Sequence, residues 1–224
     1  MVFQDVVLFD DTVMENIRLG RRCDTAEEYG REAEMVQKAL RTLCMDENGM
    51  LTDGPGHRDI SQQCQVFGIL TGTLNREEGR ANLLRTLEDP SAAKCTVAMD
   101  YYLFRALEQT GLYEETDRCW NIWRKMTENN CTTCVEAEFY ARSECHAWGA
   151  LALYELPSVI LGVRPGAPGY EKILEKPLPG AFTRASGLVM TPRGPLQVSW
   201  ELRDGKAETV VQFDPSIRER ICQG

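Results

Sequence analysis

One segment, from Cys131 to Trp148, gathers most of the side chains in this sequence that could carry out chemistry. A glycosidase needs one protonated carboxylic acid for the leaving oxygen and one carboxylate that activates water or attacks the sugar. Aromatic rings stack on the apolar face of a sugar, and charged side chains satisfy hydroxyls that would otherwise be buried unpaired. The residue types therefore indicate carbohydrate chemistry. The side chains concerned are Glu136, Glu138, Arg142, Glu144, His146 and Trp148.

A simpler interpretation of this segment is a polar loop that leads into a buried helix, with Glu138 and Glu144 as solvated surface groups. Motifs on both sides of the segment favour the chemical interpretation, because they follow one another in a specific order. They are Gln37–Leu40, Asp46–Gly56, Ser61–Gln63, Tyr102–Leu107, Trp120–Trp123 and Leu161–Tyr170. In order and spacing they resemble the C-terminal part of the bacterial α-L-rhamnosidases, glycoside hydrolase family 78.

The resemblance implies roles for four residues of the segment. The family's general base ends a segment like Ala-Thr-Thr-x-x-Glu, which places the base at Glu136. The family pattern Ser-x-Cys-His-Ala-Trp matches Ser143–Trp148 and implies that His146 lines the sugar subsite. Trp148 is a weaker substrate-binding candidate, because a helical tryptophan is more often a core residue than a stacking platform. Arg142 is a further substrate-binding candidate.

The family's acid-bearing segment, a loop rich in Asp and Glu that is followed by Gly-Trp, has no counterpart in this sequence. Enzymes of the family are inverting, and the two carboxyl groups of an inverting glycosidase stand about 6.5 to 9.5 Å apart across the sugar. One carboxyl group alone gives little catalysis. We therefore expect a fragment of an inverting α-L-rhamnosidase, acting on terminal α-L-rhamnosides, that is inactive alone.

The first part of the chain shows a different resemblance. Val2–Arg18 is similar to the Gln-loop region of an ABC-transporter ATP-binding domain, with Gln4 at the position of the loop glutamine. A P-loop of the form Gly-x-x-x-x-Gly-Lys-Ser/Thr, which would cradle the phosphates, does not occur in the sequence, and neither does the Leu-Ser-Gly-Gly-Gln signature. An ATP-binding fragment is thus the weaker alternative. The join between the two resemblances falls near residues 32 to 35.

Composition limits the partners. The net charge of −9 argues against nucleic acid and against an anionic membrane surface, since both need a basic face. The sequence has no apolar run near 20 residues and no signal peptide at its N-terminus. An odd count of nine scattered cysteines suits reduced thiols better than a disulfide framework. We expect a cytoplasmic protein.

A zinc site must be weighed, because Cys131 and Cys134 form a Cys-x-x-Cys pair and Cys145-His146 follows closely. Structural zinc motifs usually pair two such knuckles, and the adjacent residues Cys145 and His146 would point in different directions on a helix. We therefore expect no metal and no other cofactor.

Periodicity predicts a mainly helical scaffold. In the segment after Gly111, apolar residues from Cys119 to Met126 fall at helical spacing, and the run Cys145–Leu156 is apolar nearly all round, with Pro157 as its end. The resemblance implies the second half of an (α/α)6 six-hairpin barrel, whose apolar faces would be exposed and could lead to self-association. The predicted helices span residues 27–44, 59–74, 76–88, 94–110, 114–128 and 144–156.

In the C-terminal part the apolar residues change from helical spacing to the alternation of a β-strand. Leu196–Leu202 alternates apolar and polar residues like a half-buried strand, Arg203–Lys206 supplies an Asp-Gly turn, and Ala207–Phe213 gives the returning strand. The fold class is therefore α+β, a partial barrel followed by a small antiparallel β-sandwich. We divide the chain into an ABC-like fragment at 1–33, the half-barrel at 34–165 and the β-sandwich at 166–224. A non-catalytic helical carbohydrate-binding or scaffolding protein remains the main alternative.

Overall fold

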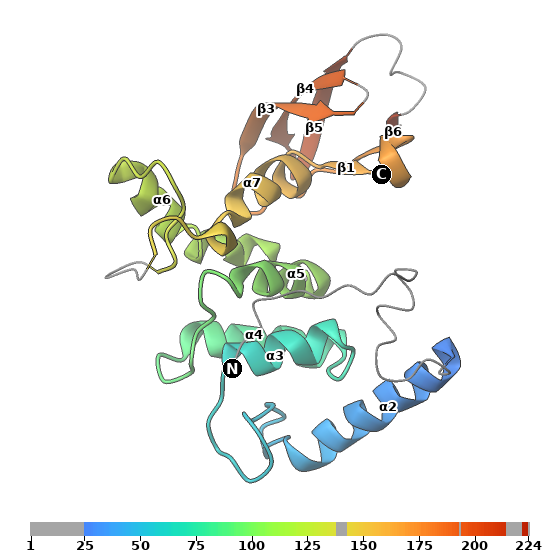
Figure 1. Cartoon of the computed structure of the whole chain (residues 1–224), viewed down its shortest axis with the longest axis vertical. Helices are drawn as coiled ribbons and strands as arrows, with labels where there is room; N and C mark the ends of the chain where they lie inside the picture. Colours follow the sequence, from blue (N-terminus) through green and yellow to red (C-terminus); the bar gives the residue numbers. More distant parts are fainter. Residues whose placement is uncertain (1–24, 138–142, 193, 214–220, 224) are drawn as a thin grey trace, which may run out of the picture.

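A computed structural model describes residues 25–137, 143–192, 194–213 and 221–223. Six α-helices lead into two small sheets, as expected for a partial helical barrel and a β domain (Figure 1). The described part has no helix both long and apolar enough to cross a bilayer. The helices are α2 (Ala26–Leu43), α3 (Gln62–Leu70), α4 (Arg76–Glu88), α5 (Asp100–Thr110), α6 (Asn121–Glu128) and α7 (Leu151–Glu155).

Capping residues set two of the helix starts. Thr25 and Glu28 form a capping box at the start of α2, and Asn75 and Glu78 form another at the start of α4. The chain then turns at Gly111, whose φ of 71° ends α5 in the left-handed conformation. Helices α2 and α4 therefore begin within one residue of the predicted positions.

Helices α3, α4 and α5, in the middle of Figure 1, pack together around a first core. Helix α2 lies to one side of them, and none of its residues is buried. Its contacts with the core helices include the Arg41–Glu78 ion pair. Apolar side chains of α2 face solvent, with Met35 70% and Val36 58% exposed. The first core is formed by Leu51, Val66, Ile69, Leu74, Leu83, Leu103, Ala106, Leu107 and Leu112.

The β domain contains two three-stranded sheets. Strands β3 (Arg184–Thr191), β4 (Gly194–Arg203) and β5 (Lys206–Phe213) form an antiparallel sheet in the order β3-β4-β5. The predicted hairpin is confirmed, because Arg203 pairs with Lys206 across the turn. In the second sheet β1 (Val163–Pro165) is antiparallel to β2 (Ile173–Glu175), whereas β2 and β6 (Ile221–Gln223) are parallel.

The predicted run 144–156 is less regular than expected. Its α-helical part is only Leu151–Glu155, after a 3-10 turn η2 (Ala147–Gly149). Pro157 does not stop the chain from coiling, because a π-helical turn η3 (Leu156–Ile160) includes it. The run is not buried on all sides either, since Leu153 and Leu156 are exposed. The α-helix itself ends at Glu155, close to the predicted end at Pro157, and the chain then continues as η3.

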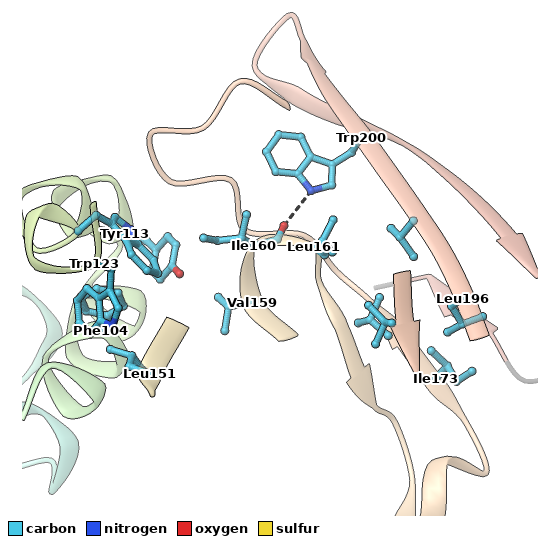
Figure 2. Close-up of a cluster of buried hydrophobic side chains, with 14 of the residues drawn as sticks. Phe104, Tyr113, Trp123, Leu151, Val159, Ile160, Leu161, Ile173, Leu196 and Trp200 are labelled. Atoms are coloured by element: carbon cyan, nitrogen blue, oxygen red, sulfur yellow. Dashed lines mark hydrogen bonds between the residues drawn. The ribbon is translucent and has the colours of Figure 1, made fainter. Parts of the chain in front are cut away.

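A second core joins the helical part to the β domain (Figure 2). Phe104, Trp123 and Leu151 from the helices belong to the same buried cluster as Ile173 and Trp200 from the strands. The Trp200 indole N–H donates to the main-chain oxygen of Ile160 at 2.8 Å, which ties β4 to the end of η3. The predicted boundary at residue 165 therefore lies within one continuous core.

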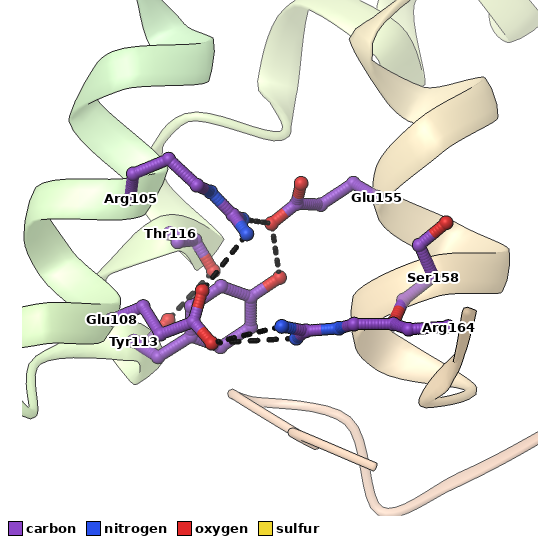
Figure 3. A network of polar contacts seen from close by, with 7 residues as sticks. All are labelled: Arg105, Glu108, Tyr113, Thr116, Glu155, Ser158 and Arg164. Carbon is purple, nitrogen blue, oxygen red and sulfur yellow. Dashed lines mark hydrogen bonds and ion pairs between the residues drawn. The ribbon is translucent and has the colours of Figure 1, made fainter. Parts of the chain in front are cut away.

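A buried polar network crosses the same junction (Figure 3). The carboxylate of Glu155, which is fully buried, accepts hydrogen bonds from Arg105 and, at 2.7 Å, from the hydroxyl of Tyr113. Arg164 of β1 contacts Glu108 of α5 at 3.3 Å. Burial raises the pKa of Glu155, and the Arg105 guanidinium opposes that rise. Charged groups from three elements thus fix the β domain against α5.

Candidate functional site

Main-chain hydrogen bonds join the segment that carries Glu136 to the segment that carries His146. The N–H of Glu136 donates to the carbonyl of Ser143 at 2.9 Å, and the N–H of His146 donates to the carbonyl of Cys134 at 2.8 Å. The hydroxyl of Thr133 donates to the carbonyl of Glu144. These bonds bring two residues ten positions apart in the sequence, Glu136 and His146, to the same base of the loop.

The neighbouring helices hold this loop in place. The indole N–H of Trp123 donates to the carbonyl of Gly149 at 2.8 Å, so α6 is tied to the start of α7. Gly149 is buried, and a Cβ atom there would lie 2.7 Å from the carbonyl oxygen of Val135. Only glycine allows the two ends of the loop to pack this closely.

Glu136 and His146 both line a cleft of about 870 Å³, and both are half-buried. The N-terminal residues of two core helices, Gln62 of α3 and Asp100 of α5, line the same cleft. The wall combines apolar, cationic and acidic groups. The lining residues also include Lys94, Cys95, Val97, Leu103, Arg118, Cys119, Ile122, Lys125 and Ala137.

The structure places only one of the other two predicted site residues, Trp148. Trp148 is 65% exposed and does not line the cleft. Arg142 falls outside the described residues. The structure therefore brings together Glu136 and His146, the candidate base and the first-choice binding residue.

Sequence reasoning missed Asp100. This residue is only 8% exposed although it carries a carboxyl group, and burial raises its pKa from 3.8 to about 7. The predicted helix 94–110 put Asp100 in a helix interior, whereas α5 in fact starts at Asp100 and directs its first residue to the cleft. A correct helix boundary would have been the signal for this residue.

Two of the cations that line the cleft already have partners. The ammonium group of Lys94 donates to the carbonyls of Thr86 and, at 2.6 Å, of Asp89. Arg118 pairs with Glu115 at 2.8 Å. Neither group is therefore positioned to neutralise a carboxylate inside the cleft.

His, Cys and acidic side chains could also bind a metal ion. Within the ranges that the structure describes, no group of three or more His, Cys, Asp and Glu side chains could hold a metal ion. The seven cysteines in these ranges whose side chains are described, including Cys131, Cys134 and Cys145, are free thiols.

Comparison with known proteins identifies the fold. Residues 162–216 match the model of the bacterial alpha-L-rhamnosidase C-terminal domain. The chain is similar to the family GH78 rhamnosidase of Bacillus sp. GL1, with 26% identity over 88% of this chain and 23% of that one and a TM-score of 0.73. An alpha-L-rhamnosidase from Dictyoglumus thermophilum has 20% identity over 85% of this chain and 23% of that one, with a TM-score of 0.62.

A third structure, the Streptomyces avermitilis alpha-L-rhamnosidase complexed with L-rhamnose, has 19% identity over 84% of this chain and 20% of that one, with a TM-score of 0.56. No curated protein sequence matches the chain. The chain thus spans less than a quarter of the length of these rhamnosidases. None of these matches is to an ABC-transporter protein, and residues 1–24 lie outside the described ranges, so that resemblance stays a prediction. The chain is similar to the C-terminal part of the family 78 bacterial α-L-rhamnosidases, from the helical domain into the C-terminal β domain.

Proposed function

We propose that this chain is the base-bearing and sugar-binding part of an inverting α-L-rhamnosidase. The observation that carries the proposal is that Glu136 and His146, which the family resemblance singles out, line one cleft in a chain with the rhamnosidase fold. An inverting glycosidase needs a carboxylate that activates water on the face of the sugar opposite the leaving group. In this proposal Glu136 takes the proton from that water.

His146 holds a sugar hydroxyl in the same cleft. Its main-chain N–H is fixed by the carbonyl of Cys134, so its ring is presented from a rigid position. L-rhamnose is the proposed sugar, because it is the ligand named for the Streptomyces avermitilis structure and rhamnose is named as bound for the rhamnosidase of Klebsiella oxytoca. Trp148 and Arg142 remain lesser candidates for contacts with the aglycone side of the substrate.

Turnover by the chain alone is a separate question. The sequence holds no counterpart of the family's acid-bearing segment, so we expect little or no product release without a proton donor for the leaving oxygen. Free thiols fit a reducing compartment, which supports a cytoplasmic location. The exposed apolar residues of α2, such as Met35 and Val36, support self-association through this face.

Release of nitrophenol from the aryl α-L-rhamnoside tests the catalytic part of the proposal. The chain is compared with Glu136→Gln and with Glu144→Gln, a matched control because Glu144 belongs to the same loop but is exposed and does not line the cleft. We expect no release above the uncatalysed rate. Release that persists in Glu136→Gln would contradict the role of Glu136. Release abolished in Glu136→Gln and kept in Glu144→Gln would support that role and overturn the expected inactivity.

A further inference from the structure

The carboxyl group of Asp100 is the most unusual polar group in the cleft. It is 8% exposed, and none of the described residues makes a hydrogen bond or an ion pair with it. Buried carboxyl groups are normally hydrogen-bonded or paired, because burying such a group unpaired is costly. Asp100 therefore lacks the protein partner that a structural carboxyl group would have.

The surroundings of Asp100 explain why no partner is supplied. The pKa values of the Cys95 and Cys119 thiols are raised to about 12, mainly by burial and in addition by the nearby Asp100 carboxylate. The side-chain oxygen of Gln62, at the start of α3, accepts a hydrogen bond from the N–H of Cys95 at 3.0 Å. Turning the Gln62 side chain toward Asp100 would break that hydrogen bond. Two cations of the lining, Lys94 and Arg118, are held by other groups.

The position of Asp100 points to a ligand rather than to the protein core. As the first residue of α5 it lines the same cleft as Glu136 and His146, which come from a different segment of the chain. We infer that Asp100 is a substrate-binding residue at the floor of this cleft, where its carboxyl group hydrogen-bonds one ring hydroxyl of the α-L-rhamnosyl unit.

This inference rests on the proposed function and adds to it a residue that fixes which hydroxyl is recognised. A neutral carboxyl group can both donate and accept, which matches a sugar hydroxyl. The raised pKa of Asp100 keeps a large share of the group protonated near pH 7. Removing either the Asp100 carboxyl group or the sugar hydroxyl leaves the remaining group without a hydrogen-bond partner in a partly desolvated cleft.

Deoxy sugars test the inference directly. Binding of methyl α-L-rhamnoside and of its 2-, 3- and 4-deoxy analogues is measured by calorimetry for the chain, for Asp100→Ala and for Asp100→Asn. We expect one deoxy analogue to bind the unaltered chain about tenfold or more weakly than the parent glycoside. That same analogue and the parent should bind Asp100→Ala equally. Asp100→Asn should retain part of the discrimination, since its amide can still donate and accept.

The result that would overturn the inference is an Asp100→Ala variant that binds all four glycosides as the unaltered chain does, or more weakly by one common factor. A purely structural role of Asp100 predicts that all four glycosides bind more weakly by one common factor, because a general loosening of the cleft does not select one hydroxyl. His146→Ala separates this from the proposed function: if it loses rhamnoside binding while Asp100→Ala does not, only the inference about Asp100 fails. If the unaltered chain binds none of the glycosides, both proposals are overturned.

Discussion

Replacement of Asp100 by Asn should change how the stability of the protein depends on pH. In the folded chain burial raises the pKa of Asp100 from 3.8 to about 7, whereas in the unfolded chain it returns to its ordinary value. Between these two values the unfolded state releases the proton and the folded state keeps it. The free energy of unfolding therefore falls as the pH rises from about 4 to about 7, and this loss is complete above pH 7.

The magnitude follows from the two pKa values. At 1.36 kcal/mol per pKa unit, a rise from 3.8 to about 7 corresponds to about 4 kcal/mol above pH 7 and to less than half of that at pH 5. The Asn variant does not titrate, so its stability relative to the unaltered chain should increase by about 2 to 3 kcal/mol between pH 5 and pH 8. Any pH-independent cost of the amide shifts all points equally and does not affect this difference.

Urea unfolding of the unaltered chain and of Asp100→Asn at pH 5, 6, 7 and 8 measures this difference in stability. The other titratable and charged groups of the cleft are present in both proteins, so their own titrations cancel in the difference. A stability difference that stays constant across this range would refute the reasoning, because it would show that Asp100 is ionised in the folded protein as in the unfolded one. The groups concerned are Lys94, Cys95, Arg118, Cys119, Lys125, Glu136 and His146.

Three further predictions concern the scaffold. Arg105→Met should lower the free energy of unfolding, measured by urea titration, by about 3 to 5 kcal/mol, because it leaves the fully buried Glu155 carboxylate without its cation. The control Arg203→Met removes an exposed ion pair and should change the free energy of unfolding by less than about 1 kcal/mol. Trp200→Ala should cost about 3 to 5 kcal/mol and should lower the unfolding midpoint of the helices as well as of the strands, since both share one core; separate transitions by far-ultraviolet circular dichroism and by tryptophan fluorescence would contradict this. Met35→Lys on the exposed face of α2 should reduce self-association in sedimentation velocity, and an unchanged association state would exclude this face as the contact.

Local signals in the sequence were sufficient for the helices that end in their own caps. Helix α4 was predicted at its observed bounds, and the Asn75–Glu78 capping box at its start is formed by residues close together in the sequence. The β4–β5 hairpin was predicted equally well from alternation and the Asp-Gly turn. In both cases neighbours in the sequence determine the structure.

Boundaries that depend on distant residues were not predictable in this way. Residues 94–99 have helical composition, but Gln62 holds the N–H of Cys95 and the main chain of Ala93 pairs with Ile60 and Gln62, so α5 starts later. For the same reason Asp100 was not recognised as a cleft residue. The irregular start of the run after Ser143 has a similar cause, because the main chains of Ser143 and His146 bond to Glu136 and Cys134.

The prediction of the site itself came from the family resemblance. Composition and spacing indicated carbohydrate chemistry in the segment but could not choose among its carboxylates. The resemblance singled out Glu136 and His146, and the main-chain pairing of the loop shows how two such residues reach one cleft.

Binding of methyl α-L-rhamnoside to the isolated chain, followed by two-dimensional amide NMR, tests the central proposal most directly. We predict saturable shifts that cluster at residues lining the cleft, such as those around Gln62, Glu136 and His146, with binding weakened about tenfold or more in His146→Ala. Absence of saturable shifts in the folded chain, or equal binding by His146→Ala, would contradict the assignment of this cleft as the rhamnoside site.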